Sequence, residues 1–124
     1  MTIVTALTKA GARSLLDAAF ASLLDPHEPV ENLSRHYSET CVQEIDGVRM
    51  DYAEFLGHAR ALKQSLRSAR VSFEALIVED PAVAAMYLVE TQTMNGDNAK
   101  LKIIAFITIE DGRIAALTEL THPM

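Results

Sequence analysis

This sequence has a single cysteine and no long apolar run, and each of these features excludes a class of protein. Cys41 is the single cysteine among 124 residues, so no disulfide can form within the chain, which favours a reducing, cytoplasmic location. No apolar run approaches the roughly 20 residues that span a bilayer. The first 20 residues lack a basic start followed by an uninterrupted apolar core, so we expect neither a secretion signal nor a membrane partner.

Positive charge is also scarce. Lys and Arg together number 11 against 17 Asp and Glu, which gives a net charge of -6, and the basic residues form no cluster. Binding a phosphate backbone requires clustered Lys and Arg, so we expect no nucleic-acid partner.

The composition that remains suits one packed domain. Apolar residues make up 49% of the chain and charged residues 23%, values typical of globular proteins and unlike those of disordered chains. Dividing a chain of this length would leave pieces too small to bury separate cores. We therefore expect a single domain over residues 1–124.

Two helices and a hairpin are predicted at the start of the chain. Apolar residues recur at helical spacing from Leu7 to Leu24, where Pro26 ends the pattern, and a shorter helix opens near Pro29. In "CVQEIDGVRM", Asp46-Gly47 separates two β-compatible runs. Because glycine tolerates positive φ, this pair predicts a two-residue hairpin turn.

A third helix and four strands follow. Asp51, with Glu54 three residues later, predicts a capping box, and the buried stripe of the helix it opens consists of Phe55, Leu56, Ala59, Leu62 and Leu66. The runs "VSFEALIVE", "AVAAMYLVETQTM", "AKLKIIAFITIE" and "RIAALTELTH" then have β-compatible patterns separated by short turns, which predicts an antiparallel meander. This order of elements indicates an α+β fold with the helices gathered on one face of a curved sheet.

The run from Ile103 to Ile107 is apolar on both strand parities. A sheet with one solvent-facing side should instead alternate apolar and polar residues. The helices can cover one face, and a second copy of the sheet is the simplest cover for the other. We therefore expect a homodimer that packs through the sheet face; the alternative, a flap of the same chain, has little sequence left to supply it.

This element order resembles the nuclear transport factor 2-like superfamily, and within it the SnoaL-like and ketosteroid-isomerase-like branch. The best local points are "IDGVRMDYAEFLGHARAL", similar to the family's hairpin and third helix, and "FITIEDGRIAALTELTH", similar to its closing hairpin. The resemblance covers roughly Leu7 to His122. It implies a SnoaL-like, cystatin-like cone in which three helices pack on a curved, mostly antiparallel sheet around an apolar pocket, often in a sheet-packed dimer.

The isomerase of this superfamily uses a base carboxylate on the first hairpin, together with a tyrosine and a protonated carboxylic acid that bind the developing enolate. The resemblance puts Phe20 at the tyrosine position and Ala105, or Ile104, at the acid position, and none of these side chains donates a hydrogen bond. The base position falls near Gln43 or Glu44, and only Glu44 has the chemistry. We therefore do not expect steroid-isomerase activity.

The polyketide-cyclase branch is similar in keeping an aspartate late on its final strand as acid/base, and His122 falls close to that position. Histidine can take and return a proton near neutral pH, although a residue so near the chain end is often solvent-facing. Strand side chains alternate, so Glu119 and His122 point to opposite faces. The sequence leaves open which face lines the pocket: His122 shares its face with Thr118 and Leu120, and Glu119 shares the other with Leu117 and Thr121.

The strand around "YLVETQT" offers another ionisable candidate. Met86, Leu88, Glu90 and Gln92 share one parity, and Tyr87, Val89 and Thr91 share the other. If the first set faces the pocket, it adds a carboxylate and an amide to an apolar wall, as expected of a small-molecule site. If it faces a partner or solvent, Glu90 is only an interface polar group.

Together these patterns define one candidate site. Its catalytic candidates are Glu44, Glu90 and His122, and its pocket-lining candidates are Phe20, Tyr52, Phe55, Met86, Leu88, Gln92, Ala105 and Thr118. No pair of histidines has metal-ligand spacing, and phosphate-loop and dinucleotide motifs are absent, so neither a metal nor a cofactor is predicted.

The favoured hypothesis is that a small hydrophobic or aromatic metabolite binds in the cone. If the chain is an enzyme, which the sequence leaves open, the expected class is isomerisation, dehydration or cyclisation next to a carbonyl. The alternative is a noncatalytic dimeric binding or interaction module. An open cavity with converging polar groups favours the first hypothesis, and an interior filled by apolar side chains favours the second.

Overall fold

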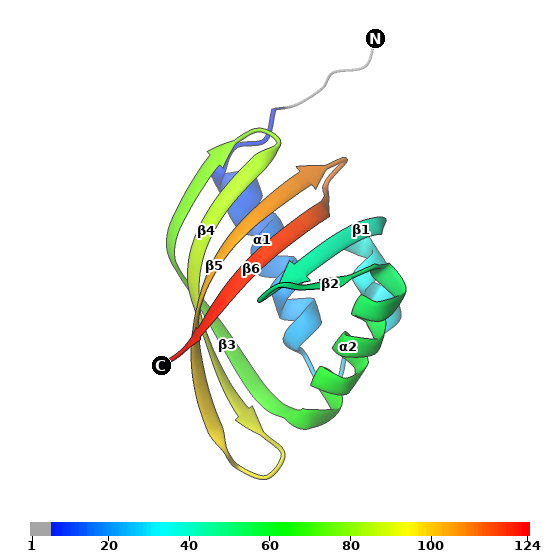
Figure 1. The fold of residues 1–124 in the computed structure, drawn as a ribbon, viewed down its shortest axis with the longest axis vertical. Helices are drawn as coiled ribbons and strands as arrows, with labels where there is room; N and C mark the ends of the chain where they lie inside the picture. Colours follow the sequence, from blue (N-terminus) through cyan, green and yellow to red (C-terminus); the bar gives the residue numbers. More distant parts are fainter. Residues whose placement is uncertain (1–5) are drawn as a thin grey trace.

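The computed structural model describes residues 6–124, which form two α-helices, one 3₁₀-helix and a six-stranded sheet (Figure 1). Residues 1–5, where the stretch examined for a secretion signal begins, lie outside the described residues. None of the helices in the described part of the chain is both long and apolar enough to cross a membrane. The elements are α1 (Lys9–Leu24), η1 (Val30–Arg35), β1 (Tyr37–Ile45), β2 (Val48–Met50), α2 (Tyr52–Ser65), β3 (Leu66–Glu79), β4 (Ala82–Thr93), β5 (Asn98–Glu110) and β6 (Arg113–Pro123).

Each α-helix begins after a residue that caps it. The Thr8 hydroxyl accepts a hydrogen bond from the Gly11 amide at 3.0 Å at the start of α1. The capping box predicted for α2 is confirmed: Asp51 Oδ1 accepts from the Glu54 amide at 2.8 Å, and Glu54 Oε1 accepts from the Asp51 amide at 3.1 Å. Such caps satisfy amides that have no partner within the helix. The predicted short helix is η1, which opens after Pro29.

The strands form one sheet in the order β2-β1-β6-β5-β4-β3. The predicted meander is confirmed for β3 to β6, while β1 pairs with β2 in a hairpin and runs parallel to β6. Asp46 and Asp111 have φ angles of 51° and 53°, and each is followed by a glycine with positive φ, as two-residue hairpin turns require. β3 begins at Leu66, directly after α2, and is therefore longer than the run predicted from Val71.

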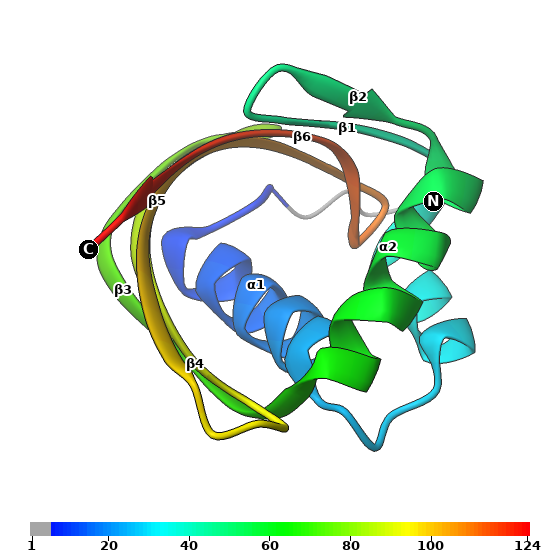
Figure 2. The same ribbon diagram turned by 60° about the horizontal axis from the view of Figure 1, so that its bottom comes forward.

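The sheet curves around α1, and α2 and η1 lie on the remaining side (Figure 2). The core between these layers includes Leu16 and Phe20 of α1, Phe55 of α2, and Tyr87 and Ile107 of the sheet. The α+β architecture, with helices on one face of a curved and mostly antiparallel sheet, is therefore confirmed.

A buried lysine connects the two α-helices. Lys63 Nζ of α2 donates hydrogen bonds to the main-chain carbonyls of Ser22 and Asp25, the latter at 2.8 Å, at the C-terminal end of α1. A cation is favourable at this end of a helix because the last carbonyls lack intrahelical partners. This contact joins the C-terminal ends of α1 and α2.

The two faces of the sheet have different side chains. The inner face, turned toward α1, carries Tyr87 of β4, Ile103 of β5, and Leu117 and Glu119 of β6. The outer face, turned away from the helices, carries a group that we call the apolar strip: Ile77, Ala84, Met86, Ile104, Phe106 and Leu120. Phe106 and Leu120 are 67% and 63% exposed. A single copy of the chain therefore leaves this strip facing water.

A one-residue bulge sets which face each β6 side chain takes. Ile109 of β5 pairs with Ile114, but Thr108 pairs with Ala116, so Ala115 is an extra residue in β6. An extra residue reverses the facing of the residues beyond it, because side chains alternate along a strand. This bulge places Glu119 on the inner face.

Candidate functional site

A cavity of about 270 Å³ lies between the inner face of the sheet and the helices α1 and α2. Most of its lining is apolar and aromatic, and its polar lining consists of Tyr37, Gln43, His58, Tyr87, Thr91, Glu119 and Thr121. A largely apolar cavity with a few converging polar groups is typical of small-molecule sites. The interior is therefore open, and its one carboxylate belongs to Glu119.

Glu119 forms a hydrogen bond with a tyrosine across three strands of the sheet. The Tyr87 hydroxyl of β4 donates to Glu119 Oε1 of β6 at 3.0 Å. Between them on β5 lies Ala105, which pairs directly with Glu119 and with Ala85. These two alanines leave room for the tyrosine ring to reach diagonally across the sheet. Because the bond uses Oε1, the second carboxyl oxygen can face a ligand.

Burial in the cone wall raises the pKa of Glu119 above its usual value. The Tyr87 hydrogen bond lowers this pKa, and the negative charge of Asp46 raises it further, but burial is the largest effect. Removing water disfavours the charged form of a carboxyl group. A carboxyl group with a raised pKa moves closer to the range in which it exchanges protons efficiently near neutral pH.

Two tyrosines near Glu119 remain neutral hydrogen-bond donors. Burial, followed by the Glu119 charge, raises the pKa of Tyr37 and of Tyr87 well above the usual phenol value. Their rings also form the cavity walls: Tyr87 lies 5.0 Å from Phe20, and Tyr37 lies 4.6 Å from Phe55, measured between ring centroids. The polar end of the cavity is thus bordered by flat aromatic surfaces.

Gln43 contributes a second polar group to the inner wall. It faces inward from β1 and is 3% exposed, and its Nε2 atom is buried without a hydrogen-bond partner in the described structure. Gln43 pairs with Leu117 of β6, while Ile45, two residues along β1, pairs with Glu119. Gln43 and Glu119 are therefore diagonal neighbours on the same face.

The structure brings only part of the predicted pocket together. Phe20 and Phe55 line the cavity. Ala105 lies on the inner face beneath the bond between Tyr87 and Glu119 and does not line the cavity. Tyr52 packs beside Phe55, with ring centroids 6.3 Å apart, and is likewise not part of the lining.

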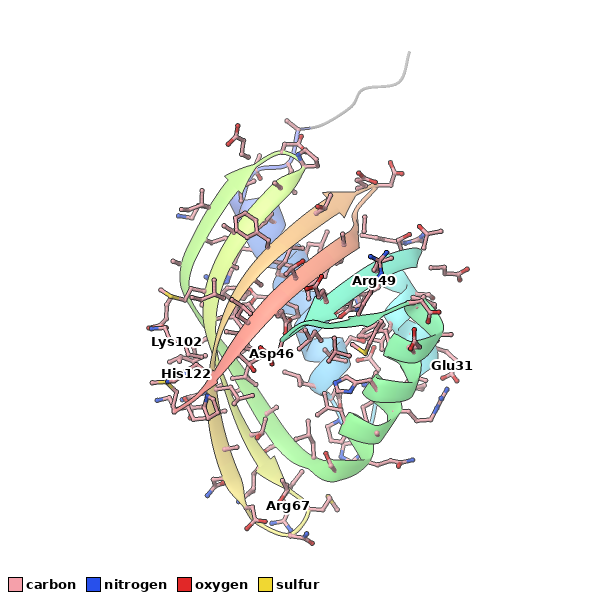
Figure 3. All side chains as sticks on the ribbon, in the orientation of Figure 1. Glu31, Asp46, Arg49, Arg67, Lys102 and His122 are labelled. Atoms are coloured by element: carbon pink, nitrogen blue, oxygen red, sulfur yellow. The ribbon has the colours of Figure 1, made fainter. Side chains whose placement is uncertain are left out.

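The three predicted catalytic residues all lie outside the cavity, which corrects their predicted placement. Glu44 is an exposed residue of β1, next to the inward-facing Gln43. Glu90 points away from the cavity and pairs with Arg70, whose Nη2 lies 3.0 Å from Glu90 Oε1 and lowers the pKa of Glu90. His122 is exposed and lies beside Lys102 on the outer face (Figure 3).

Four of the residues predicted to line the cavity also lie outside it. Met86, Leu88 and Gln92 alternate with Tyr87, Val89 and Thr91 on β4, and the second set lines the cavity. Thr118 is turned outward by the bulge at Ala115. All four residues occupy the parity that faces away from the helices.

Glu119, Tyr87 and Gln43 were weighed from the sequence but were not chosen as site residues. The charged residues of β5 indicate which side chains of the sheet face solvent. Lys100, Lys102 and Glu110 are separated by even numbers of residues, so they lie on one face of β5, and that face is expected to be the solvent-facing one. Pairing β4 to β5 without a bulge then turns Tyr87 inward. For β6 the bulge would also have to be known, because without it the same reasoning turns His122 inward.

Other hollows and clusters suit a binding site less well. Two broader hollows lie beside the β4–β5 turn and between α1 and β3; the first is lined mostly by charged and polar side chains, and the second by a mixture of polar and apolar ones. Within residues 6–124, no three His, Cys, Asp or Glu side chains are grouped so that they could hold a metal ion. The cone cavity is therefore the best candidate site.

Comparison with known proteins identifies the fold. No family model matches the chain. An uncharacterized protein of Schizosaccharomyces pombe (strain 972) is 25% identical over 111 residues, which cover 90% of this chain and 85% of that protein.

Several solved structures have a similar fold at low sequence identity. A protein from Jannaschia sp. CCS1 named as a SnoaL-like polyketide cyclase has a TM-score of 0.73 at 9% identity, over 97% of this chain and 91% of its own. An LEH-like epoxide hydrolase of M. tuberculosis has a TM-score of 0.74 at 14% identity, over 92% and 84%. A de novo designed protein with a curved β-sheet has a TM-score of 0.68 at 16% identity, over 94% and 89%. The chain therefore has the nuclear transport factor 2-like fold, as its resemblance implied.

Proposed function

We propose that the chain binds a small, largely apolar molecule in the cone cavity and catalyses proton transfer next to a carbonyl group, with Glu119 as the acid/base. The observation that carries this proposal is the hydrogen bond between Tyr87 and Glu119 inside a mostly apolar cavity of about 270 Å³. Isomerisation, dehydration and cyclisation all need such a proton transfer.

The proposed step moves only a proton and electron pairs. The Glu119 carboxylate takes a proton from the carbon beside the carbonyl, the C–H electrons form a carbon–carbon double bond, and the carbonyl electrons move to oxygen. Return of the proton at another position completes an isomerisation. The raised pKa of Glu119 supports this role, because a stronger base abstracts a carbon-bound proton more readily. The step itself needs no cofactor.

The surroundings of Glu119 supply the other requirements. Aromatic rings of Phe20 and Tyr87 on one side, and of Tyr37 and Phe55 on the other, suit a flat apolar molecule and exclude water. Similar folds in proteins named as a polyketide cyclase and an epoxide hydrolase support a small-molecule substrate, although fold alone does not determine activity.

Hydrogen–deuterium exchange in D₂O tests the proposal without knowledge of the product. We expect the wild-type protein to speed loss of the proton signal beside the carbonyl in a panel of small neutral ketones that begins with acetophenone, followed by NMR. Glu119→Gln keeps the size of the side chain and its ability to accept from Tyr87 but cannot take the proton. We expect it to lower the exchange rate by about 10²- to 10⁴-fold.

Glu44→Gln is the matched control, because it removes an exposed carboxylate one residue from Gln43 on the opposite face of β1. It should exchange at the wild-type rate. Equal rates for wild type and Glu119→Gln across the panel would show that Glu119 is not the base. Binding of the ketones without any exchange would instead favour a noncatalytic binding module.

The same proposal includes a homodimer formed through the outer face of the sheet. Support comes from the apolar strip, whose side chains Ile104, Phe106 and Leu120 are each more than half exposed. The adjacent ion pairs Lys102–Glu74 and Arg70–Glu90 give it a polar rim. An apolar centre with a polar rim is the usual composition of a protein interface.

The proposed setting is the cytoplasm. Cys41 is the single cysteine and is buried, and burial raises the pKa of its thiol to about 11, so little of it is present as the reactive thiolate. The net charge of -6 supports a small uncharged ligand over nucleic acid.

A further inference from the structure

Gln43 has an unusual position for a buried amide. Its side chain lines the cavity, the residue is 3% exposed, and Nε2 has no hydrogen-bond partner in the described structure. An unpaired buried polar group is costly, so most such groups in folded proteins have partners. Because the residue lines the cavity, a ligand there is the candidate partner once the amide turns its N–H toward the cavity.

The neighbours of Gln43 indicate where that ligand group would lie. Gln43 and Glu119 face inward from the adjacent parallel strands β1 and β6, two residues out of register. Both side chains line the cavity. A ligand between the two side chains would place its carbonyl oxygen toward Gln43 and the carbon beside it toward Glu119. Rotation of the terminal amide is enough to turn its N–H toward that carbonyl oxygen.

The charge of the cavity limits the ligand further. Among residues 6–124, no Lys or Arg lines it, and its carboxylate belongs to Glu119. An anionic ligand would meet the like charge of Glu119, which no Lys or Arg of the lining offsets, so a carboxylate or phosphate group is disfavoured; His58 of α2 is the one lining side chain that can carry a positive charge. An uncharged ligand oxygen has no such penalty and accepts a hydrogen bond from the amide.

We propose that Gln43 is the specificity residue of the cavity and selects neutral carbonyl compounds, its amide N–H donating to the carbonyl oxygen of a ligand held beside Glu119. This inference rests on the proposed function and adds the substrate class and the residue that recognises it. In the proton-transfer step, the same N–H stays bonded to the oxygen as negative charge develops there. Such a donor in a dry site stabilises the charge more than water does.

The test compares acetophenone with α-methylstyrene, which has the same shape but carries a methylene group in place of the carbonyl oxygen. Their dissociation constants are measured for wild type, for Gln43→Met and for Gln64→Met by ligand-observed NMR. Methionine matches glutamine in length and cannot donate a hydrogen bond. Gln64 is an exposed residue of α2 outside the cavity, so it provides the matched control.

The measured quantity is the preference for acetophenone, taken as the ratio of the two dissociation constants within each protein. Comparing ratios cancels the different hydrophobicity of the two probes. Loss of one hydrogen bond should reduce the preference about 5- to 10-fold in Gln43→Met and leave it unchanged in Gln64→Met. An unchanged preference in Gln43→Met would overturn the inference.

A second readout uses the wild-type protein alone. In ¹⁵N-labelled protein, acetophenone should shift the side-chain NH₂ signals of Gln43, and α-methylstyrene should leave them nearly in place. Equal shifts with both probes would overturn the inference even if Gln43→Met did not fold. Benzoate, which adds a charge at the same position, should bind more weakly than acetophenone, and tighter binding of benzoate would overturn the selection for neutral ligands.

The outcomes separate this inference from the proposed function. Carbonyl preference that depends on Gln43, without proton exchange that depends on Glu119, would keep the specificity role and remove the catalytic one. Exchange that depends on Glu119, with a preference indifferent to Gln43, would do the reverse. If neither probe binds at millimolar concentration, both proposals fail.

Discussion

At the scale of single residues, Glu119 makes folding stability depend on pH in a direction that can be calculated. Its pKa is raised in the folded protein, chiefly by burial, so the folded state holds this proton more tightly than the unfolded chain does. The contribution of Glu119 to stability is therefore greatest below the ordinary glutamate pKa of about 4.3 and falls as pH rises through its raised value.

Glu119→Gln removes this dependence. We expect the variant and the wild type to have similar free energies of unfolding near pH 4, and the variant to become the more stable of the two as pH rises toward neutrality. Urea unfolding at several pH values measures the difference. Glu44→Gln controls for the loss of one negative charge. A gap between Glu119→Gln and wild type that narrows with rising pH would contradict the raised pKa.

The chemistry of the site was predicted better than its residues. A carboxylate and an amide in an apolar cone were expected, and the cavity contains both, but they are Glu119 and Gln43 in place of Glu90 and Gln92. At the first hairpin the choice between Gln43 and Glu44 was made on chemical ability. The structure favours Gln43 over Glu44. Consecutive strand residues point to opposite faces, and Gln43 is the one whose side chain points into the cone.

At the scale of elements, local signals predicted the helices and turns well. The Asp51 capping box and the Asp46-Gly47 turn each depend on residues close in sequence, and both are present. The extension of β3 back to Leu66 was missed, because its pairing with β4 depends on residues distant in sequence.

The bulge in β6 explains why His122 and Thr118, and not Glu119, were predicted to face the cavity. If the Asp111-Gly112 turn were followed by unbroken pairing, Ala105 would lie opposite Thr118, and His122 would face the cavity. The extra residue at Ala115 shifts the partner of Ala105 to Glu119. Nothing in "RIAALTELTH" marks a bulge, since a run of small and apolar residues fits either register.

The turn between β1 and β2 is hydrogen-bonded to β6 near the cavity. Asp46 Oδ1 accepts from the Thr121 amide at 2.8 Å, and Oδ2 accepts from the Thr121 hydroxyl at 2.5 Å. These bonds lower the pKa of Asp46. The stability they add is therefore present above the ordinary aspartate pKa and is lost as pH falls through the lowered value.

Asp46→Ala should loosen this attachment. We expect several-fold faster amide hydrogen exchange at Thr121 and along β1 and β2 at neutral pH. Asp111→Ala is the matched control, because Asp111 has nearly the same positive φ before a glycine but, within residues 6–124, no side-chain hydrogen bond to a neighbouring strand like those of Asp46 with Thr121. Equal acceleration of Thr121 exchange by the two variants would assign the effect to the turn backbone and not to the bonds with Thr121.

At the scale of the whole molecule, the curved sheet gives the cavity its shape but does not define its chemistry. A named polyketide cyclase, an epoxide hydrolase and a designed protein all have this architecture. Function therefore depends on the side chains that the fold presents, and we propose that those of the inner face bind the ligand and those of the outer face mediate association.

The apolar strip predicts that two copies of the chain associate through their outer faces. Ile104 is near the centre of the strip, between Met86 and Leu120 on the neighbouring strands, and is 54% exposed in the single chain. A two-fold interface contains every substitution twice, so Ile104→Lys would bury two unpaired charges. We expect it to weaken dimerisation roughly 100-fold or more.

Sedimentation equilibrium measures this directly, because one chain has a mass of 13.6 kDa and a dimer twice that. Val48→Lys is the matched control: Val48 is 64% exposed, but it lies on β2 at the far edge of the sheet, away from the strip. The wild type and Val48→Lys should sediment as dimers at micromolar concentration and Ile104→Lys as a monomer. A wild-type monomer under these conditions would show that the strip is not a self-association surface, whereas a dimer resistant to Ile104→Lys would place the interface elsewhere.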